Sequence, residues 1–469
     1  MIDILWGIMG MTLLLGIAVL FSVDRRKIKI RTVAVALAIQ VTFAVLVLYI
    51  PWGQTVLSGV TQAVQAVIDQ SSEGIDFLFG DLVEAGDAPF ALTVLPVIIF
   101  FASLTAVLYH LKVLQFVVRV IGGLLQKLLG TSRAESMNAA ANIFVGQTEA
   151  PLVIRPYIAG MTKSELFAVM VGGLSTVAGS VLVGYNLMGA DLEYLIAACF
   201  MAAPGALLMA KILVPAGSFD EVDAAVVEKE NPELMLTDKR RLEEPALGGS
   251  AYAKSSASGS ATATPAEAGT EETSDGTGDL LGGEEEPRSD DQYGTPQARN
   301  VIDAAARGAS DGLRLALNVG AMLLAFIALI ALLNLFVGQI GGWFDYGELT
   351  IEEILGYVFA PVMWAMGVPW EEATAAGSFL GQKVILNEFV AFADFGPQVD
   401  AFSAKSQAII TFALTGFANL SSLAILLGGL GSIAKTRRSE IAQLGLRAVL
   451  AGTLANLMSA AIVGMILVG

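Results

Sequence analysis

Residues 142–155 read NIFVGQTEAPLVIR, a polar island between apolar segments of the chain. Glu149 lies near its centre, after Gln147 and Thr148 and before Pro151. In a chain that is mostly membrane-spanning this is a costly place for a carboxylate, which is tolerated where it faces a cavity, an ion or a substrate. The alternative is a solvated glutamate in a cytoplasmic loop. We expect Glu149 to face a binding site.

A second polar island of the same character occupies residues 381–392, GQKVILNEFVAF, with Lys383 and Glu388 among apolar residues. Both islands open with Gly-Gln and carry a glutamate. Each is followed by an apolar segment with small polar interruptions, at 171–181 (VGGLSTVAGSV) and at 414–424 (LTGFANLSSLA). Paired, glycine-interrupted apolar segments in two halves of a chain are typical of secondary transporters with a site at the membrane midplane.

Composition places the chain among membrane proteins with several spans. Of its 469 residues 55% are hydrophobic and 15% are charged, whereas about 25% of a soluble domain is charged. The single cysteine, Cys199, lies in an apolar run, so no internal disulfide can form and the thiol is expected in the core. The single histidine, His110, is expected where an apolar helix ends, and it cannot build a histidine metal site alone.

Eight apolar segments are expected to cross the membrane. They are residues 2–22, 32–50, 90–111, 164–187, 193–214, 310–337, 406–430 and 443–468. The basic cluster DRRKIKIR at 24–31 is assigned to the cytoplasm, and the acidic stretch after Pro51, which lacks Lys and Arg, to the outside. Both termini then lie outside. Two further segments, 56–70 and 349–366, are expected as helices at or near the outer interface.

Both islands are expected to enter and leave the membrane from one face. Arg133 precedes the first island and Arg155 and Lys163 follow it, so a single crossing would place one basic flank outside. The second island follows an external stretch without Lys or Arg and dips in from the opposite side. The expected fold is an all-α polytopic membrane protein of about eight transmembrane helices plus two re-entrant hairpins in an inverted repeat.

A long acidic segment separates the two halves. Residues 217–309 hold 20 Asp or Glu against 8 Lys or Arg, a net of -12 within the chain's -17. Low hydrophobicity and high charge predict a disordered, cytoplasmic linker that transport does not need, and a regulatory or partner-binding segment is the alternative. Five segments are therefore expected. They are scaffold and interfacial helices at 1–130, a first transport repeat at 131–215, the linker at 216–309, a long scaffold helix with an external interfacial helix at 310–372, and a second transport repeat at 373–469.

Three motifs together resemble the signatures of the concentrative nucleoside transporter family. They are GQTEAPL at 146–152 followed by RPY at 155–157, the G-x-K-x-x-x-NEFVA pattern at 381–391, and GFANLSS at 416–422. The resemblance covers nearly all of residues 1–215 and 310–469. It implies a homotrimeric, cation-coupled importer of nucleosides in the plasma membrane, whose partners are the nucleoside and the lipid bilayer rather than a nucleic acid. The acidic linker departs from the compact family pattern.

The resemblance also implies which residues bind the nucleoside. On the base side they are Gln147, Thr148, Glu149 and Val181, and on the ribose side they are Glu388, Phe417, Asn419 and Ser422. An amide offers a donor and an acceptor to a base edge, and a carboxylate can accept from two adjacent ribose hydroxyls. The alternatives are core packing for Val181 and Phe417 and interhelical hydrogen bonds for Asn419 and Ser422. A structural role is favoured for Lys383.

A sodium site is implied in the first repeat. Asn142 and Thr176 would give side-chain oxygens and Val145 and Val177 backbone carbonyls, which suit a hard monovalent cation. The competing explanation makes Asn142 a helix cap and Thr176 a residue that bonds back to its own helix. The competing coupling ion is a proton carried by Glu149.

Other functions remain as alternatives to a sodium-coupled nucleoside importer with alternating access. Within transport, the substrate would be a free nucleobase or another small polar solute, and the Glu388 side would then lack its purpose. The remote alternative is an intramembrane enzyme using Glu149 and Glu388 as general acid and base. The sequence lacks a nucleophile–base pair, a cluster of metal ligands and a basic phosphate patch. We therefore expect no enzymatic activity and no prosthetic cofactor.

Overall fold

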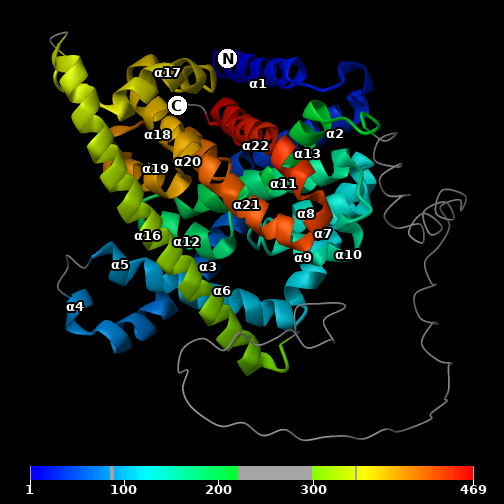
Figure 1. Cartoon of the computed structure of the whole chain (residues 1–469), viewed down its shortest axis with the longest axis horizontal. Helices are drawn as coiled ribbons and strands as arrows, with labels where there is room; N and C mark the ends of the chain where they lie inside the picture. Colours follow the sequence, from blue (N-terminus) through cyan, green and yellow to red (C-terminus); the bar gives the residue numbers. More distant parts are fainter. Residues whose placement is uncertain (1, 85–88, 220–297, 344–345, 468–469) are drawn as a thin grey trace, which may run out of the picture. The chain divides into compact units, whose positions relative to one another are not determined.

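The computed structural model describes residues 2–84, 89–219, 298–343 and 346–467, and every regular element in these ranges is a helix (Figure 1). In the first half the α-helices are α1 (Ile2–Leu20), α2 (Ile30–Ala44), α3 (Pro51–Phe79), α4 (Asp81–Glu84), α5 (Phe90–Thr93), α6 (Leu95–His110), α7 (Val113–Leu129), α8 (Arg133–Ala141), α9 (Ala150–Val153), α10 (Arg155–Ile158), α11 (Lys163–Ser175), α12 (Gly179–Leu187) and α13 (Leu192–Leu213). In the second half they are α16 (Val301–Gly342), α17 (Ile351–Ala365), α18 (Trp370–Ile385), α19 (Glu388–Phe395), α20 (Ala404–Leu414), α21 (Leu420–Ile433) and α22 (Arg438–Ile466). The predicted all-helical fold class is confirmed.

The same order of helices occurs twice along the chain. A helix, an irregular stretch, short helices, a broken pair and a long helix follow one another as α8, α9 and α10, α11–α12 and α13. The second series is α18, α19, α20–α21 and α22. The first polar island begins directly after α8 and includes α9, and the second spans the end of α18 and the start of α19. The structure thus shows the duplication that the islands indicated.

Two apolar segments are each divided into two half-helices where the sequence predicted breaks. The first break separates Ser175, the last residue of α11, from Gly179, the first of α12. The second separates Leu414 from Leu420. Asn419 has extended backbone angles and caps α21, because its Oδ1 accepts a backbone hydrogen bond at 2.7 Å.

Six helical segments among the described residues are long and apolar enough to cross a membrane. They are Ile30–Tyr49, Phe90–His110, Lys163–Leu187, Leu192–Leu213, Val301–Gly342 and Lys435–Ile466. Each corresponds to a predicted span, and α6 ends at His110 as expected. The predicted span 2–22 forms the shorter apolar helix Ile4–Leu20, and 406–430 is divided between α20 and α21. The segments 56–70 and 349–366 are helical, within α3 and as α17, which bends by 116° relative to α18.

The spans differ in how much of their surface the protein covers. In Lys163–Leu187 and in Leu192–Leu213, 89% of the most apolar window is buried, against 17% in Val301–Gly342. Helix α16 packs along α6, and its exposed residues include Leu317, Leu324 and Leu335. Large apolar side chains on such a surface fit contact with lipid or with other subunits rather than with water.

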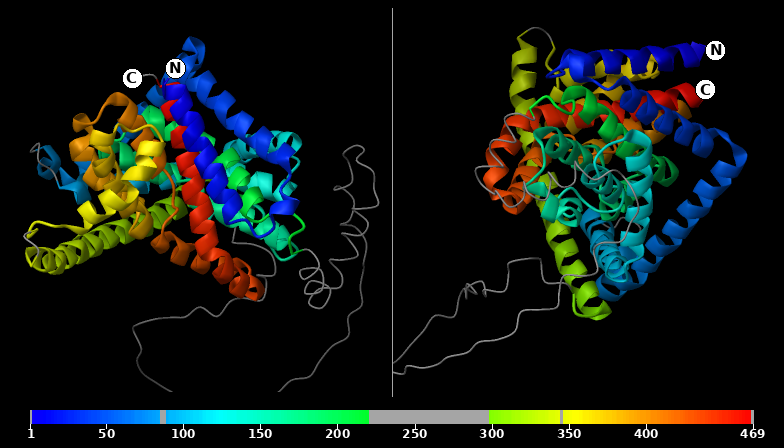
Figure 2. Two further views of the ribbon diagram at one scale, coloured as in Figure 1. Left: turned by 90° about the horizontal axis from the view of Figure 1, so that it is seen from above. Right: turned by 90° about the vertical axis from the view of Figure 1, so that its right-hand side faces the viewer.

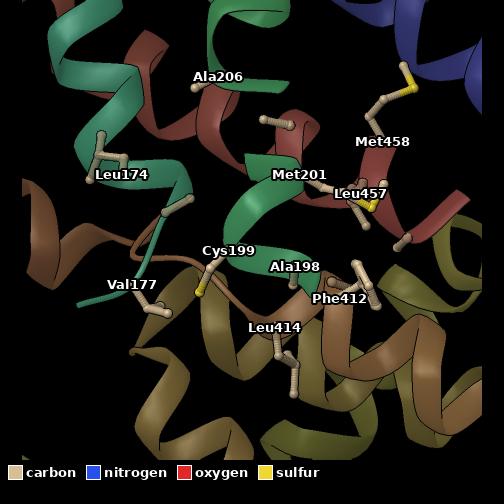
Figure 3. Close-up of a cluster of buried hydrophobic side chains, with 14 of the residues drawn as sticks. Leu174, Val177, Ala198, Cys199, Met201, Ala206, Phe412, Leu414, Leu457 and Met458 are labelled. Carbon is tan, nitrogen blue, oxygen red and sulfur yellow. The ribbon is translucent and has the colours of Figure 1, made fainter. Parts of the chain in front are cut away.

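Helix α22 is the central element of the buried core. It packs against α1, α11, α13 and α20, and both views of Figure 2 show α1 in blue beside α22 in red. Figure 3 shows Leu174 of α11, Phe412 of α20 and Met458 of α22 in one apolar cluster with Cys199 of α13. Cys199 is 2% exposed, which confirms its predicted place in the core.

Helix α16 begins at Val301, before the boundary that the sequence suggested at 310. Asn300 caps it by accepting a hydrogen bond from Asp303 N at 2.8 Å, and Arg307 lies 3.0 Å from the Asp303 carboxylate one turn later. Charge and missing apolar periodicity had assigned residues 301–309 to the linker. An asparagine cap and three successive alanines instead favour a helix there. The remainder of the predicted linker, at 220–297, lies outside the described residues.

Candidate functional site

Glu388 occupies the first turn of α19, directly after the irregular end of α18. Its neighbour Asn387 caps α19 through a backbone hydrogen bond of 2.9 Å, which fixes where the helix starts. Glu388 is 2% exposed, and two donors hold its carboxylate. Tyr185 Oη donates to Oε1 at 3.0 Å and Asn419 Nδ2 donates to Oε2 at 2.6 Å. The structure therefore brings together two ribose-side candidates, Glu388 and Asn419.

Tyr185 is a candidate site residue that the sequence analysis missed. It lies on α12 and is fully buried. Its ring stacks on Phe392, with centroids 4.4 Å apart, and meets Phe389 edge to face at 4.9 Å. Both phenylalanines belong to α19, so the tyrosine joins α12 to α19, which lies in the other half of the chain. The signal in the sequence was a hydroxylated aromatic residue in an apolar half-helix just after a predicted break.

The first island packs on α11 at two adjacent glycines. A Cβ atom at Gly172 would lie 3.0 Å from Asn138 Nδ2 and 3.3 Å from Asn142 Nδ2. A Cβ atom at Gly173 would lie 2.8 Å from Gln147 Cβ. Such close approach leaves room only for hydrogen at these two positions. The VGG sequence at 171–173 is therefore the part of α11 against which the first island packs.

Three buried side-chain oxygens of residues that pack against these glycines accept no hydrogen bond among the described residues: Asn138 Oδ1, Asn142 Oδ1 and Gln147 Oε1. Two of the amide nitrogens are engaged. Asn142 Nδ2 donates to Asn138 O at 2.9 Å, and Asn138 Nδ2 donates to Val169 O at 3.3 Å. An unpaired buried acceptor costs about 1–3 kcal/mol. These oxygens suit a cation or an N–H group of a ligand, and Asn142 is at the same time the C-cap residue of α8.

The other sodium candidates lie where the first island meets the first break. Gly179 N donates to Phe144 O at 3.2 Å and ties the two stretches together. Thr176 and Val177 are buried there, and Val145 is half-buried. Thr176 Oγ1 donates to a backbone carbonyl one turn earlier at 2.9 Å, which is the competing role foreseen for it. A hydroxyl that donates one hydrogen bond keeps its acceptor lone pairs.

Glu149, which was expected to face a binding site, is exposed in the structure. Its side chain accepts a hydrogen bond from Thr148 Oγ1 at 2.9 Å. Thr148 is half-buried against α21, where a Cβ atom at Gly429 would lie 2.5 Å from its Cγ2. Gln147 packs against α11. Because successive residues of a turn point in different directions, Thr148 and Glu149 do not face α11 as well. No hydrogen bond joins these three residues to Glu388 within the described ranges.

The two helix breaks touch each other. Phe417 N, in the second break, donates to Thr176 O, in the first, at 3.1 Å. The Phe417 side chain is half-buried, and Ser422 is buried in the first turn of α21 with its N–H directed at Asn419 Oδ1. Val181 is 1% exposed in α12, which agrees with the core role named as its alternative. Candidates for ion and ribose binding thus meet at one backbone hydrogen bond.

Lys383 has the structural environment that the sequence favoured for it. It is fully buried, and its Nζ donates to Ala413 O at 2.7 Å and to Asn456 Oδ1 at 2.8 Å. Asn456, on α22, is a second residue that the sequence analysis missed. An isolated asparagine in a long apolar span was its signal, because such a side chain needs polar partners.

Family models match three successive parts of the chain. The model described as Na+ dependent nucleoside transporter N-terminus matches residues 9–82, the one described as nucleoside recognition matches 91–192, and the one described as Na+ dependent nucleoside transporter C-terminus matches 194–464. The third alone covers more than half of the 469 residues.

Similar proteins extend over nearly the whole chain. The uncharacterized transporter YutK of Bacillus subtilis is 50% identical over 464 residues, 99% of each protein. The nucleoside permease NupC of Helicobacter pylori is 42% identical, covering 98% of this chain and 97% of its own length. Solute carrier family 28 member 3 of Homo sapiens is 32% identical, covering 97% of this chain and 59% of the human protein.

Solved structures give the same picture in three dimensions. CNTnw in an inward-facing substrate-bound state aligns with a TM-score of 0.81 at 47% identity, covering 99% of this chain and 98% of that one. A CNTnw variant in an outward-facing state aligns with a TM-score of 0.81 at 46% identity, with the same coverage. The similar fold is therefore known in states that open to opposite faces.

Proposed function

Because the chain belongs to the Na+-dependent nucleoside transporter family, we propose that it imports nucleosides across the plasma membrane by alternating access, driven by inward sodium flow. Coupling import to one positive charge contributes about 2.3 kcal/mol per 100 mV of membrane potential, or about 50-fold accumulation. A gradient of sodium adds to this driving force.

The environment of Glu388 is the observation that carries the nucleoside part of the proposal. A carboxylate that is 2% exposed needs strong donors, and Tyr185 and Asn419 supply only one each. Two carboxylate oxygens have about four acceptor sites. Two adjacent ribose hydroxyls match the remaining capacity with charge-assisted hydrogen bonds, which are roughly twice as strong as neutral ones. A free nucleobase has no such pair to offer.

The base would bind at the first island. Gln147 Oε1 is buried without a donor, and a ring N–H or exocyclic amine of a base would provide one. Thr148 and the exposed Glu149 line the outer part of this subsite, where they contact the base edge or water. Val181 and Phe417 supply apolar surface to the bound nucleoside, and Ser422 adds a hydroxyl near the ribose.

Sodium would bind between the first island and the first break. The unpaired Asn142 Oδ1 and the Thr176 hydroxyl supply side-chain oxygens, and the carbonyls of Val145 and Val177 complete the oxygen-rich set. The main-chain bond from Gly179 N to Phe144 O supports the proximity of the two stretches. The set contains no carboxylate, and neutral oxygens alone favour a monovalent over a divalent cation.

We further propose a homotrimer with both termini outside and the acidic linker in the cytoplasm. The basic residues at 24–31 and 435–438 support cytoplasmic placement of those loops. Exposed leucines along α16 give an apolar surface that lipid and neighbouring subunits can cover. In this placement the first island opens from the cytoplasmic side and the second from outside, as two re-entrant hairpins.

Uptake by proteoliposomes that contain the purified protein tests the proposal. Radiolabelled uridine and adenosine should accumulate in response to external sodium at fixed membrane potential and constant pH. Uridine should outcompete both uracil and 2',3'-dideoxyuridine. Uptake that ignores sodium and follows an imposed pH gradient would replace sodium by protons and keep the nucleoside site. Equal competition by uracil would instead point to a nucleobase carrier.

A further inference from the structure

Lys383 is a buried lysine whose side-chain nitrogen is held by a helix-end carbonyl and by the side chain of Asn456. Its side chain is fully buried on α18, and within the described ranges it forms no ion pair. Its Nζ bonds to Ala413 O, a carbonyl in the last turn of α20, at 2.7 Å. The C-terminal end of a helix carries partial negative charge, which favours a cation there. Lys383 therefore anchors the second hairpin to the end of a half-helix.

Asn456 extends this anchor to both breaks. Its Oδ1 accepts from Lys383 Nζ at 2.8 Å, and its Nδ2 donates to Ser175 O and to Thr415 O, each at 2.7 Å. Ser175 is the last residue of α11, and Thr415 is the C-cap residue of α20. Carbonyls at helix ends have no partner inside the helix. One amide group thus satisfies an end carbonyl from each repeat.

Gly416 leaves the space that the Asn456 side chain occupies. A Cβ atom at Gly416 would lie 2.3 Å from Asn456 Oδ1, so a side chain at that position would displace the amide. Functional candidates lie close to both bonded carbonyls, and Phe417 is two residues beyond Thr415. Thr176 follows Ser175, and Phe417 N donates to Thr176 O at 3.1 Å. The amide of Asn456 and this backbone bond hold the two breaks in one register.

We infer that Lys383 and Asn456 are positioning residues that couple sodium binding to nucleoside binding. The inference rests on the proposed function, since it concerns the same two sites. Sodium at Asn142 and Thr176 fixes the first break, and the Lys383–Asn456 pair transmits that order to the second break. There it sets Phe417 and Asn419, and Asn419 in turn holds Glu388. Neither Lys383 nor Asn456 is among the residues proposed to bind sodium or the nucleoside.

The test compares uridine binding to purified protein in sodium-free buffer and at saturating sodium. The ratio of the two dissociation constants is the coupling ratio, and we expect it to be about tenfold or more in the wild type, within the usual range of linked sites. Asn456→Asp keeps an acceptor for Lys383 but removes the donor to both carbonyls. Its ratio should fall below about threefold. Lys383→Met and Asn456→Ser should lower the ratio in the same way, and they keep the test valid where Asn456→Asp does not fold.

Ser459→Ala is the matched control. Ser459 is buried on the same helix, three residues beyond Asn456, and accepts a hydrogen bond from Gln40 away from both breaks. Its ratio should equal that of the wild type. A purely structural defect would lower the number of binding sites and leave the ratio unchanged. Because linkage is reciprocal, uridine should also tighten sodium by the same factor in each protein.

Two results would overturn the inference, and they are distinguishable. Wild-type coupling ratios in Asn456→Asp, Asn456→Ser and Lys383→Met would remove these residues from the coupling, with the proposed function intact. A wild-type protein that binds uridine equally with and without sodium would remove sodium coupling itself, and the inference with it.

Discussion

The glutamates of the two polar islands occupy opposite environments, although their sequences correspond. Glu388 is 2% exposed and receives hydrogen bonds from Tyr185 and Asn419. Glu149 is exposed and receives one from the adjacent Thr148. A duplicated motif has thus produced one preorganised carboxylate and one that water can reach. Within a preorganised site, less free energy is lost in ordering groups when the ligand binds.

The comparison assigns different tasks to the two islands. Under the proposed function the second island would recognise a feature that every nucleoside shares, and a rigid, desolvated group suits that task. The first island would face a base edge that differs between nucleosides, and it includes Asn142 of the proposed sodium site. Solvent and adaptable contacts there would accommodate more than one base. Four substitutions test this division of roles, from the largest expected effect to the smallest, and the two in the middle are expected to be of equal size.

Replacing Glu388 should have the largest effect. Glu388→Gln removes the charge that would bind two ribose hydroxyls, and each hydrogen bond to a charged group contributes about 1.5–3 kcal/mol. Uridine uptake should fall by about 100-fold or more. Initial rates in proteoliposomes measure it. The control is Glu372→Gln, which should transport normally. Glu372 is a half-buried glutamate on α18 that accepts a hydrogen bond from Ser403. An unchanged KM for uridine in Glu388→Gln would remove this residue from the site.

Replacing Asn142 should weaken sodium rather than nucleoside. Asn142→Ala deletes the unpaired oxygen, and the half-saturating sodium concentration should rise by about tenfold, or about 1.4 kcal/mol. Uridine KM at saturating sodium should stay within about twofold of the wild-type value. The matched control is Asn186→Ala, because Asn186 also bonds a backbone carbonyl four residues away. A sodium response equal to that of the wild type would place the ion elsewhere.

Removing one donor from Glu388 should give an intermediate effect. Tyr185→Phe keeps the ring packing on Phe392 and Phe389 but deletes the hydroxyl that donates at 3.0 Å. With one donor fewer, the carboxylate loses its fixed orientation, and uridine KM should rise by about tenfold, or about 1.4 kcal/mol. Tyr194→Phe on α13 is the control. If Tyr185→Phe transports like the wild type, Asn419 alone orients the carboxylate.

Replacing Glu149 should have the smallest effect of the four. Glu149→Gln alters an exposed side chain, and a neutral hydrogen bond contributes about 0.5–1.5 kcal/mol net. Uridine KM should change by about threefold, with a shift in the preference between uridine and adenosine. Competition assays measure both. A loss as large as that in Glu388→Gln would reverse the comparison, and loss of a proton-driven component would make Glu149 the coupling residue.

Local sequence signals predicted much of the fold. Asn419 and the small residues at 175–180 broke the apolar segments where the structure breaks them, because capping residues and glycines act on the backbone beside them. The predicted boundary at 310 is too late, because it does not take into account the capping residue Asn300. The charged residues at 301–309 favoured a linker, whereas α16 in fact begins directly after Asn300.

The motifs also named the residues that would form the site, but they could not show how those residues meet. The resemblance placed Glu388 and Asn419 on the same side of the nucleoside, and the structure joins them by a hydrogen bond of 2.6 Å. Tyr185 and Asn456 remained unnoticed, because a single polar residue in an apolar span is also compatible with an ordinary interhelical contact. Their partners lie far away in sequence.

By itself the sequence determined that the chain is helical, membrane-spanning, duplicated and interrupted at two polar islands, since composition, periodicity and caps act over a few residues. Only the tertiary structure decided that Glu388 is buried while Glu149 is exposed. Burial depends on which elements cover a position, and for Glu388 they include α12, which supplies Tyr185, and the start of α21, which Asn419 caps. It likewise decided that Lys383 and Asn456 connect both helix breaks, because the carbonyls they satisfy belong to separate repeats that only folding brings together.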